Sequence, residues 1–130
     1  MNSQTLRRKC TLTLLMFALS LVAVQAIAMP RRHPPLTTLY VLVTDAKTSQ
    51  PIFQAHLTLQ FPNPDSRTGK LISYSAKTDI RGKYKFSFIP MGEVFLVVTA
   101  QDHQSLGRRF QITQENQTIA VKLRKPQPLR

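Results

Sequence analysis

Hydrophobic and polar side chains alternate with a period of two along the chain after residue 36. Between Ala55 and Phe61, hydrophobic residues take every second position and polar residues the others. A strand buried on one face has this period, whereas an amphipathic helix has one near 3.6. The pattern recurs between turn-rich segments and predicts short strands, with no helical stripe after Pro30.

This pattern predicts an all-β fold, a seven-stranded antiparallel Greek-key β-sandwich. Every second side chain would face the space between two sheets packed about 10 Å apart. The predicted inward-facing residues are Leu39, Val41, Val43, Ala55, Leu57, Leu59, Phe61, Ile72, Tyr74, Ala76, Tyr84, Phe86, Phe88, Val94, Leu96, Val98, Ala100, Phe110, Ile112, Ile119, Val121 and Leu123.

Glycine and proline mark two reversals in the middle of the chain. Residues 79–82, Asp-Ile-Arg-Gly, predict a tight turn with Gly82 at a positive φ. We expect this turn to join the strand before it to the strand 83–88 as a hairpin. Pro90 and Gly92 predict the next reversal.

Residues 1–28 have the order of a secretory signal peptide. Basic residues at 7–9 precede an apolar run at 11–24, and alanines at 26 and 28 fit a cleavage site. We expect an exported protein, secreted or periplasmic. Because the apolar stretch reaches residue 29, an uncleaved N-terminal helix that anchors the chain in a membrane is the alternative.

The remaining chain has room for a single domain. We expect a Pro/Arg-rich linker at 29–36, a β-sandwich domain at 37–124 and a basic tail at 125–130. Cys10 is the only cysteine and lies in the signal segment, so no disulfide and no cysteine metal site is expected after it.

The chain is strongly basic, with 18 Lys and Arg against six Asp and Glu and a formal net charge of +12. Such an excess favours anionic partners. We predict an outward patch that binds a polyanion, such as lipopolysaccharide or an acidic polysaccharide, at the cell envelope. The alternative is a solvated surface without a specific partner. The residues of the predicted patch are Lys83, Lys85, Arg108, Arg109, Lys122 and Arg124.

Specific nucleic-acid recognition is not expected, because the chain is exported and lacks a helix that could read a groove. A protein partner is a separate expectation, since Phe95 and Val97 lie opposite the inward set of their strand and make it apolar on both faces. Either the domain's own linker or a loop covers this pair, or a partner protein does.

No catalytic, cofactor or metal site is predicted, and no enzyme activity is expected. The three histidines match no metal-ligand spacing and are interpreted as surface residues: His33, His56 and His103. Four aspartates fall in turns, where they would accept hydrogen bonds from backbone amides, and a calcium site built by loops is the alternative: Asp45, Asp65, Asp79 and Asp102. No serine lies in a nucleophile elbow.

Carbohydrate binding at the envelope is the main alternative function, and a small hydrolase is the weaker one. Carbohydrate modules usually present exposed aromatic rings, but Tyr74, Tyr84, Phe86 and Phe88 are predicted to be core residues. Tyr40 is left as an outward-facing ring. Asn116-Gln117-Thr118 fits a glycosylation sequon, which matters only in a eukaryotic source.

Two motifs resemble those of carboxypeptidase regulatory-like domains. One is Val-Thr-Asp-Ala-Lys-Thr-Ser-Gln-Pro-Ile at 43–52, and the other is Thr-Asp-Ile-Arg-Gly-Lys-Tyr-Lys-Phe at 78–86, followed by Ile-Pro-Met-Gly at 89–92. The resemblance covers about Leu36 to Leu123. It implies a transthyretin-like (prealbumin-like) sandwich and a non-catalytic binding or structural module.

Overall fold

The computed structural model describes residue 30 and residues 32–129 of the chain. Seven strands and no helix form in these residues, which confirms the all-β prediction. The predicted signal peptide lies outside the described residues. The strands are β1 (Leu36–Asp45), β2 (His56–Pro62), β3 (Leu71–Lys77), β4 (Lys83–Pro90), β5 (Gly92–Thr99), β6 (Leu106–Ile112) and β7 (Gln117–Leu123).

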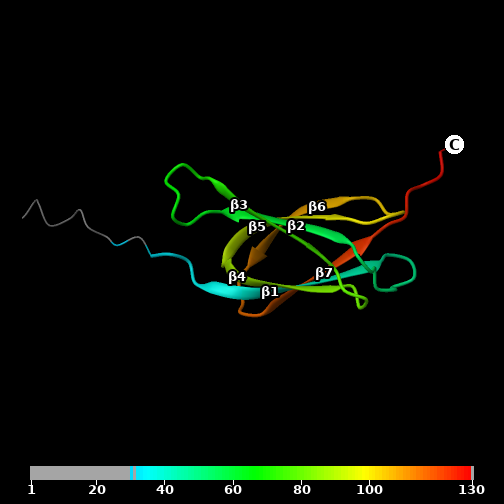
Figure 1. The fold of residues 1–130 in the computed structure, drawn as a ribbon, viewed down its shortest axis with the longest axis horizontal. Coiled ribbons are helices and arrows are strands. Elements are labelled where there is room, and N and C mark those ends of the chain that lie inside the picture. The colour runs from blue at the N-terminus through cyan, green and yellow to red at the C-terminus, as the bar shows by residue number, and fades with distance from the viewer. Residues whose placement is uncertain (1–29, 31, 130) are drawn as a thin grey trace, which may run out of the picture. The chain divides into compact units, whose positions relative to one another are not determined.

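The strands form two sheets that face each other. One has the order β4-β1-β7 and the other the order β3-β2-β5-β6, and Figure 1 shows the two as separate layers. The β1–β7 pair runs parallel, whereas every other pair in the two sheets is antiparallel. The predicted sandwich is therefore correct, but its strands are not uniformly antiparallel.

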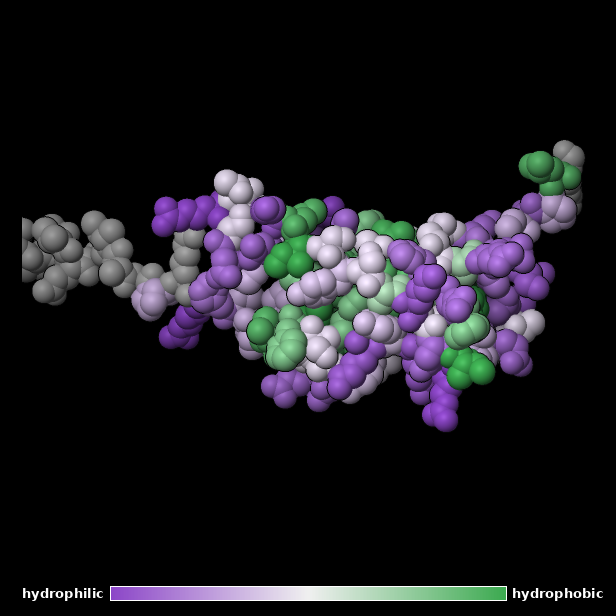
Figure 2. All heavy atoms as spheres, viewed as in Figure 1, coloured by the Kyte–Doolittle hydropathy of each residue, from purple (hydrophilic) through white to green (hydrophobic). Residues whose placement is uncertain are grey.

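The core lies between the sheets and follows the predicted alternation, except that Tyr74 and Tyr84, predicted to be core residues, are 40% and 38% exposed because β3 and β4 are edge strands. Both β1 and β5 bury every second residue, as half-covered strands do. The buried hydrophobic residues are Leu39, Val41, Val43, Ala55, Leu57, Leu59, Phe61, Phe86, Ile89, Val94, Leu96, Val98, Ile112, Ile119, Val121 and Leu123. Figure 2 shows that hydrophilic residues gather at the two ends of the domain, where the loops lie.

The predicted hairpin between β3 and β4 is wrong, because the two strands belong to different sheets. β3 pairs with β2, and β4 pairs with β1. Thr78 fixes the chain before it crosses, since its Oγ1 donates to the carbonyl of Ile52 and accepts from the amide of Ala55. Gly82 then adopts a φ of 70°, and its carbonyl accepts a hydrogen bond from the amide of Val43 on β1, in the sheet that β4 joins.

A β-bulge changes which residues of β4 face the core. Between the pairs Leu39↔Phe86 and Thr37↔Ile89, β4 has one residue more than β1. Phe88 lies in this bulge with a φ of 59° and is 74% exposed, while Ile89 is fully buried. The prediction of Phe88 as a core residue is therefore wrong, because one extra residue reverses the alternation.

In the part of the chain that the structure describes, no helix has the length and apolar character needed to cross a membrane.

Candidate functional site

A groove opens along one side of the sandwich, between the edge strands β6 and β7. Its volume is about 620 Å³, and its lining includes Arg108, Lys122 and Arg124, which we call the basic groove. Leu106, Phe110, Ala120 and Val121 add apolar surface, and Gln104 and Ser105 add polar groups. No acidic side chain is among the residues that line it.

The edges of the two sheets bring these cations together. Arg108 is opposite the buried Leu96, so it starts on the inner face of β6. It remains exposed because β6 is the last strand of its sheet. Lys122 on β7 and Arg124 just after it alternate with the buried Val121 and Leu123 and are exposed. A charge on the inner side of an edge strand also discourages pairing with another chain.

One end of the basic groove is held by a backbone hydrogen bond between the two sheets. The amide of Gln104, just before β6, donates to the carbonyl of Arg124 at 2.8 Å. This contact joins the segment just before β6 to the residue just after β7, at the end of the groove where Arg124 lies.

The other three residues of the predicted basic patch lie elsewhere. Lys83 and Lys85 are exposed on β4, next to Leu42 and Tyr40 on the outer face of the β4-β1-β7 sheet. Arg109 lies on the outer face of the other sheet, where its Nη1 is 3.4 Å from Oε1 of Glu93. Lys122 shares the outer face of Lys83 and Lys85, because it is paired with the outward Thr44, but of the six cations only Arg108, Lys122 and Arg124 line the groove.

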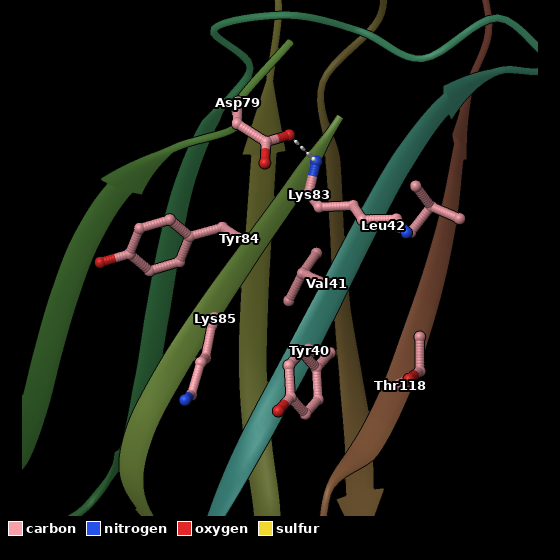
Figure 3. Close-up of a pocket in the computed structure, with 8 residues that line it drawn as sticks. All are labelled: Tyr40, Val41, Leu42, Asp79, Lys83, Tyr84, Lys85 and Thr118. Carbon is pink, nitrogen blue, oxygen red and sulfur yellow. Dashed lines mark hydrogen bonds between the residues drawn. The ribbon is translucent and has the colours of Figure 1, made fainter. Parts of the chain in front are cut away.

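Lys83, Lys85 and Tyr40 border a shallow pocket of about 380 Å³, which Figure 3 shows. Tyr40 is 39% exposed, which fits its predicted outward orientation. We call this surface, made of Tyr40, Leu42, Lys83, Lys85 and Thr118, the tyrosine face.

Asp79 lies at the rim of the tyrosine face, and one oxygen of its carboxylate is hydrogen-bonded within the turn. Its Oδ1 accepts hydrogen bonds from the amides of Arg81 and Lys83, each at 2.9 Å. Figure 3 shows the bond to Lys83. This is the turn role predicted for Asp79, and it leaves the two lysines of the face without a carboxylate partner in the described residues.

Asp45 and His103 form a nearly buried pair that the sequence did not predict. Nε2 of His103 is 2.9 Å from Oδ2 of Asp45, and the side chains are 12% and 8% exposed. Asp45 Oδ1 also accepts the amides of Lys47 and Thr48, as predicted for a turn aspartate. The interpretation of His103 as a surface residue is therefore wrong. The partners are 58 residues apart, and no local motif relates them.

Both ring nitrogens of His103 face acceptors. Nδ1 is 2.8 Å from the carbonyl oxygen of Gln101, which is the main cause of its raised pKa, and Asp45 adds to the effect. The pKa of Asp45 is well below its usual range, chiefly because the amide of Thr48 donates to it and then because His103 does. Because both ring nitrogens are already directed at acceptors within the protein, neither is free to take a proton from a substrate.

The other two histidines lie apart from this pair. His33 Nδ1 is 3.6 Å from Oδ1 of Asp65, and both side chains are well exposed. His56 is exposed on β2. Within residues 30 and 32–129, no group of three or more His, Cys, Asp or Glu side chains is placed to hold a metal ion.

Phe95 and Val97 lie on the outer face of β5, as the sequence predicted. Phe95 is 36% exposed, and Val97 is half-buried. Much of their cover comes from their own sheet. A Cβ atom added to Gly107 on β6 would lie only 3.2 Å from the Phe95 ring, so the ring rests over this glycine. An aromatic side chain that covers a glycine on a neighbouring strand shields the exposed backbone there.

Comparison with known proteins identifies the fold. No protein-family model and no curated protein matches the sequence. Among solved structures, the TIE protein of Bacillus anthracis is similar over 69% of this chain, with 21% identity and a TM-score of 0.52. A streptococcal ancillary pilin is similar over 72%, with 15% identity and a TM-score of 0.54.

The chain spans only a small part of both structures, 17% of the TIE protein and 30% of the pilin. At these identities, the likeness establishes a shared β-sandwich and says nothing about activity. It agrees with the seven strands and two sheets described above.

Proposed function

We propose that the chain is an exported, non-catalytic β-sandwich module of the carboxypeptidase regulatory-like type that binds an anionic polymer at the cell envelope. The basic groove is the binding site. The observation that carries the proposal is that Arg108, Lys122 and Arg124 line one open groove that contains no acidic residue. Three cations so placed attract a polyanion and release its counterions on contact.

The chemistry of the groove suits oxyanions. Arg108 and Arg124 each present a planar guanidinium, which can bind a carboxylate, sulfate or phosphate through two parallel hydrogen bonds. Phe110 and Leu106 supply apolar surface for the less polar part of a polymer unit. Lipopolysaccharide and acidic polysaccharides both offer this combination, and export through the predicted signal peptide would bring the domain to them.

A hydrolase is the less favoured function, because His103, the one nearly buried histidine of the described residues, joins the end of β1 to the turn between β5 and β6. Its two ring nitrogens are both directed at acceptors, one a carbonyl and one a carboxylate. A general base needs a free nitrogen within reach of the proton that it removes. The Asp45–His103 pair therefore supports a structural role.

Binding to immobilised heparin across a salt series tests the proposal. The test variant carries Arg108→Gln, Lys122→Gln and Arg124→Gln. The control carries Arg67→Gln and Lys70→Gln in the β2–β3 loop and Lys77→Gln at the end of β3, which removes the same charge next to the sheet edge opposite β6.

We expect the test variant to elute at much lower salt and the control to elute close to the original protein. The slope of log K against log salt should become less steep by about 2–3 in the test variant, because the loss of three cationic contacts means that fewer counterions are released on binding. Equal weakening of both variants would show that net charge alone drives binding. Free passage of the original protein at low salt would also refute the proposal.

A further inference from the structure

We propose that the tyrosine face is a second binding site, which takes a uronic-acid unit of an acidic polysaccharide. The sugar ring would lie against Tyr40, and its carboxylate would meet the ammonium groups of Lys83 and Lys85. The inference rests on the proposed function in that it names the anionic polymer. The two sites have no lining residue in common, although Lys122 of the basic groove lies on the same outer face as the tyrosine face.

The register of the sheet places the components of this site side by side. On the outer face, Tyr40 of β1 has Lys85 of β4 on one side and Thr118 of β7 on the other. The next outward position on β1 is Leu42, which has Lys83 beside it. Neighbouring strands lie about 4.8 Å apart, so one sugar unit can contact all three strands.

Tyr40 provides the platform. It lies on the central strand of its sheet and is 39% exposed, and Leu42 beside it is half-buried. The apolar C–H face of a sugar ring packs against such a surface, while Thr118 offers a hydroxyl to the ring's own hydroxyls. The pocket, of about 380 Å³, is in the range of small-molecule sites, roughly 300–1,000 Å³.

The charge of the tyrosine face selects an acidic sugar. Figure 3 shows the side chain of Lys83 extending across β1 towards Leu42, while that of Lys85 stays over β4. The only carboxylate at the rim, that of Asp79, accepts two turn amides. A neutral sugar would leave both ammonium groups unused, and a simple polyanion would leave Tyr40 unused. A uronic-acid unit uses both.

Equilibrium binding to four soluble probes tests this inference on the full chain: an oligogalacturonate, the same oligomer with its carboxyl groups reduced, poly-glutamate and an oligothymidylate. Two variants alter the site, Tyr40→Ala and the pair Lys83→Gln with Lys85→Gln. Tyr74→Ala is the matched control, because Tyr74 is 40% exposed but lies on the other sheet. Circular dichroism verifies that each variant is folded.

We expect Tyr40→Ala to weaken oligogalacturonate binding about tenfold, as loss of one ring contact does, and to leave poly-glutamate binding unchanged. The lysine pair should weaken binding of oligogalacturonate and have no effect on the reduced oligomer. Tyr74→Ala should bind like the original protein.

The inference is overturned if Tyr40→Ala binds oligogalacturonate normally, or if oligothymidylate binds as tightly and depends equally on Tyr40. The basic-groove variant separates this failure from failure of the proposed function. If only the groove variant loses binding, the polymer binds in the basic groove and the inference about the tyrosine face is wrong. If only Tyr40→Ala loses binding, the tyrosine face is the site and the basic groove is not.

Discussion

Asp45 and His103 hold the end of β1 to the turn between β5 and β6, and their contribution depends on pH. The pKa of His103 is above its ordinary 6.5, so the stability it adds is complete below pH 6.5 and is lost as the pH rises through the folded-state value. The pKa of Asp45 is below its ordinary 3.8, so its contribution is lost only in strong acid. The pair is therefore strongest between these two ordinary values.

We predict that the melting temperature falls as the pH rises from about 6 to about 8, and that His103→Gln removes much of this fall. Thermal unfolding followed by circular dichroism at several pH values measures it. His56→Gln, at an exposed position on β2, is the control and should keep the pH dependence. An unchanged pH profile in His103→Gln would contradict the prediction.

Gly82 is required for both its conformation and its contacts. It has a φ of 70°, and an added Cβ would overlap the carbonyl oxygen of Val43. We predict that Gly82→Ala lowers the free energy of unfolding by about 2–4 kcal/mol, from the left-handed backbone and the clash together.

Gly69→Ala is the matched control for this change, because Gly69 has a φ of 71° but no atom within 4 Å of an added Cβ. It should cost only about 1–2 kcal/mol, the conformational part alone. Urea denaturation of both variants gives the difference, and equal losses would mean that the contact with Val43 is unimportant.

At the level of elements, the bulge in β4 holds Phe88 in a backbone conformation that bulky residues avoid. Since the ring of Phe88 is mostly exposed, removing it loses little buried apolar surface. We predict that Phe88→Asn raises the free energy of unfolding by about 0.5–1 kcal/mol and that the β-branched Phe88→Val lowers it. Chemical denaturation measures both. A loss of stability in Phe88→Asn would show that the exposed ring packs usefully.

The outer face of β5, with Phe95 and Val97, is the surface at which we predict contact with a partner protein. Phe95→Ser combined with Val97→Ser should weaken association with a partner while the domain stays folded. Because Phe95 covers Gly107, we also expect a loss of about 1–2 kcal/mol in stability.

Phe53→Ser, at a position 59% exposed in the turn after β1, is the comparison for this pair and should change neither property. Pull-down from the source's envelope fraction and thermal unfolding give the two readouts. Identical association by the doubly changed domain would end the partner hypothesis.

The sequence predicted the strands better than their partners. Period-two alternation identifies a strand and its inner face, as for Leu57 and Leu59, because both depend on local residues. It does not say which sheet the strand joins, and a tight turn between two strands predicts a hairpin even where, as at β3–β4, the chain crosses to the other sheet. It also cannot detect the extra residue at Phe88. The sequence also does not predict that Arg108 lies near Arg124 or that Asp45 contacts His103, because both depend on how segments distant in the sequence pack together.

At the scale of the whole molecule, every buried hydrophobic residue in the part of the chain that the structure describes lies between Leu39 and Leu123. We therefore predict that residues 33–130 fold without the preceding segment and unfold in one cooperative transition. A chain that ends before β7 should remain unfolded, because it would lack Ile119, Val121 and Leu123. Circular dichroism with urea titration tests both, and a gradual transition in residues 33–130 would contradict the first.

The parallel pairing of β1 and β7 determines how the domain would respond to tension. Figure 1 shows the chain entering β1 at one end of the sandwich and leaving β7 at the other. A load applied between these points runs along the shared ladder from Leu39↔Gln117 to Asp45↔Leu123, so its hydrogen bonds are sheared together instead of being peeled one after another. Tension between the two ends of the domain would therefore be resisted by all the β1–β7 hydrogen bonds at once.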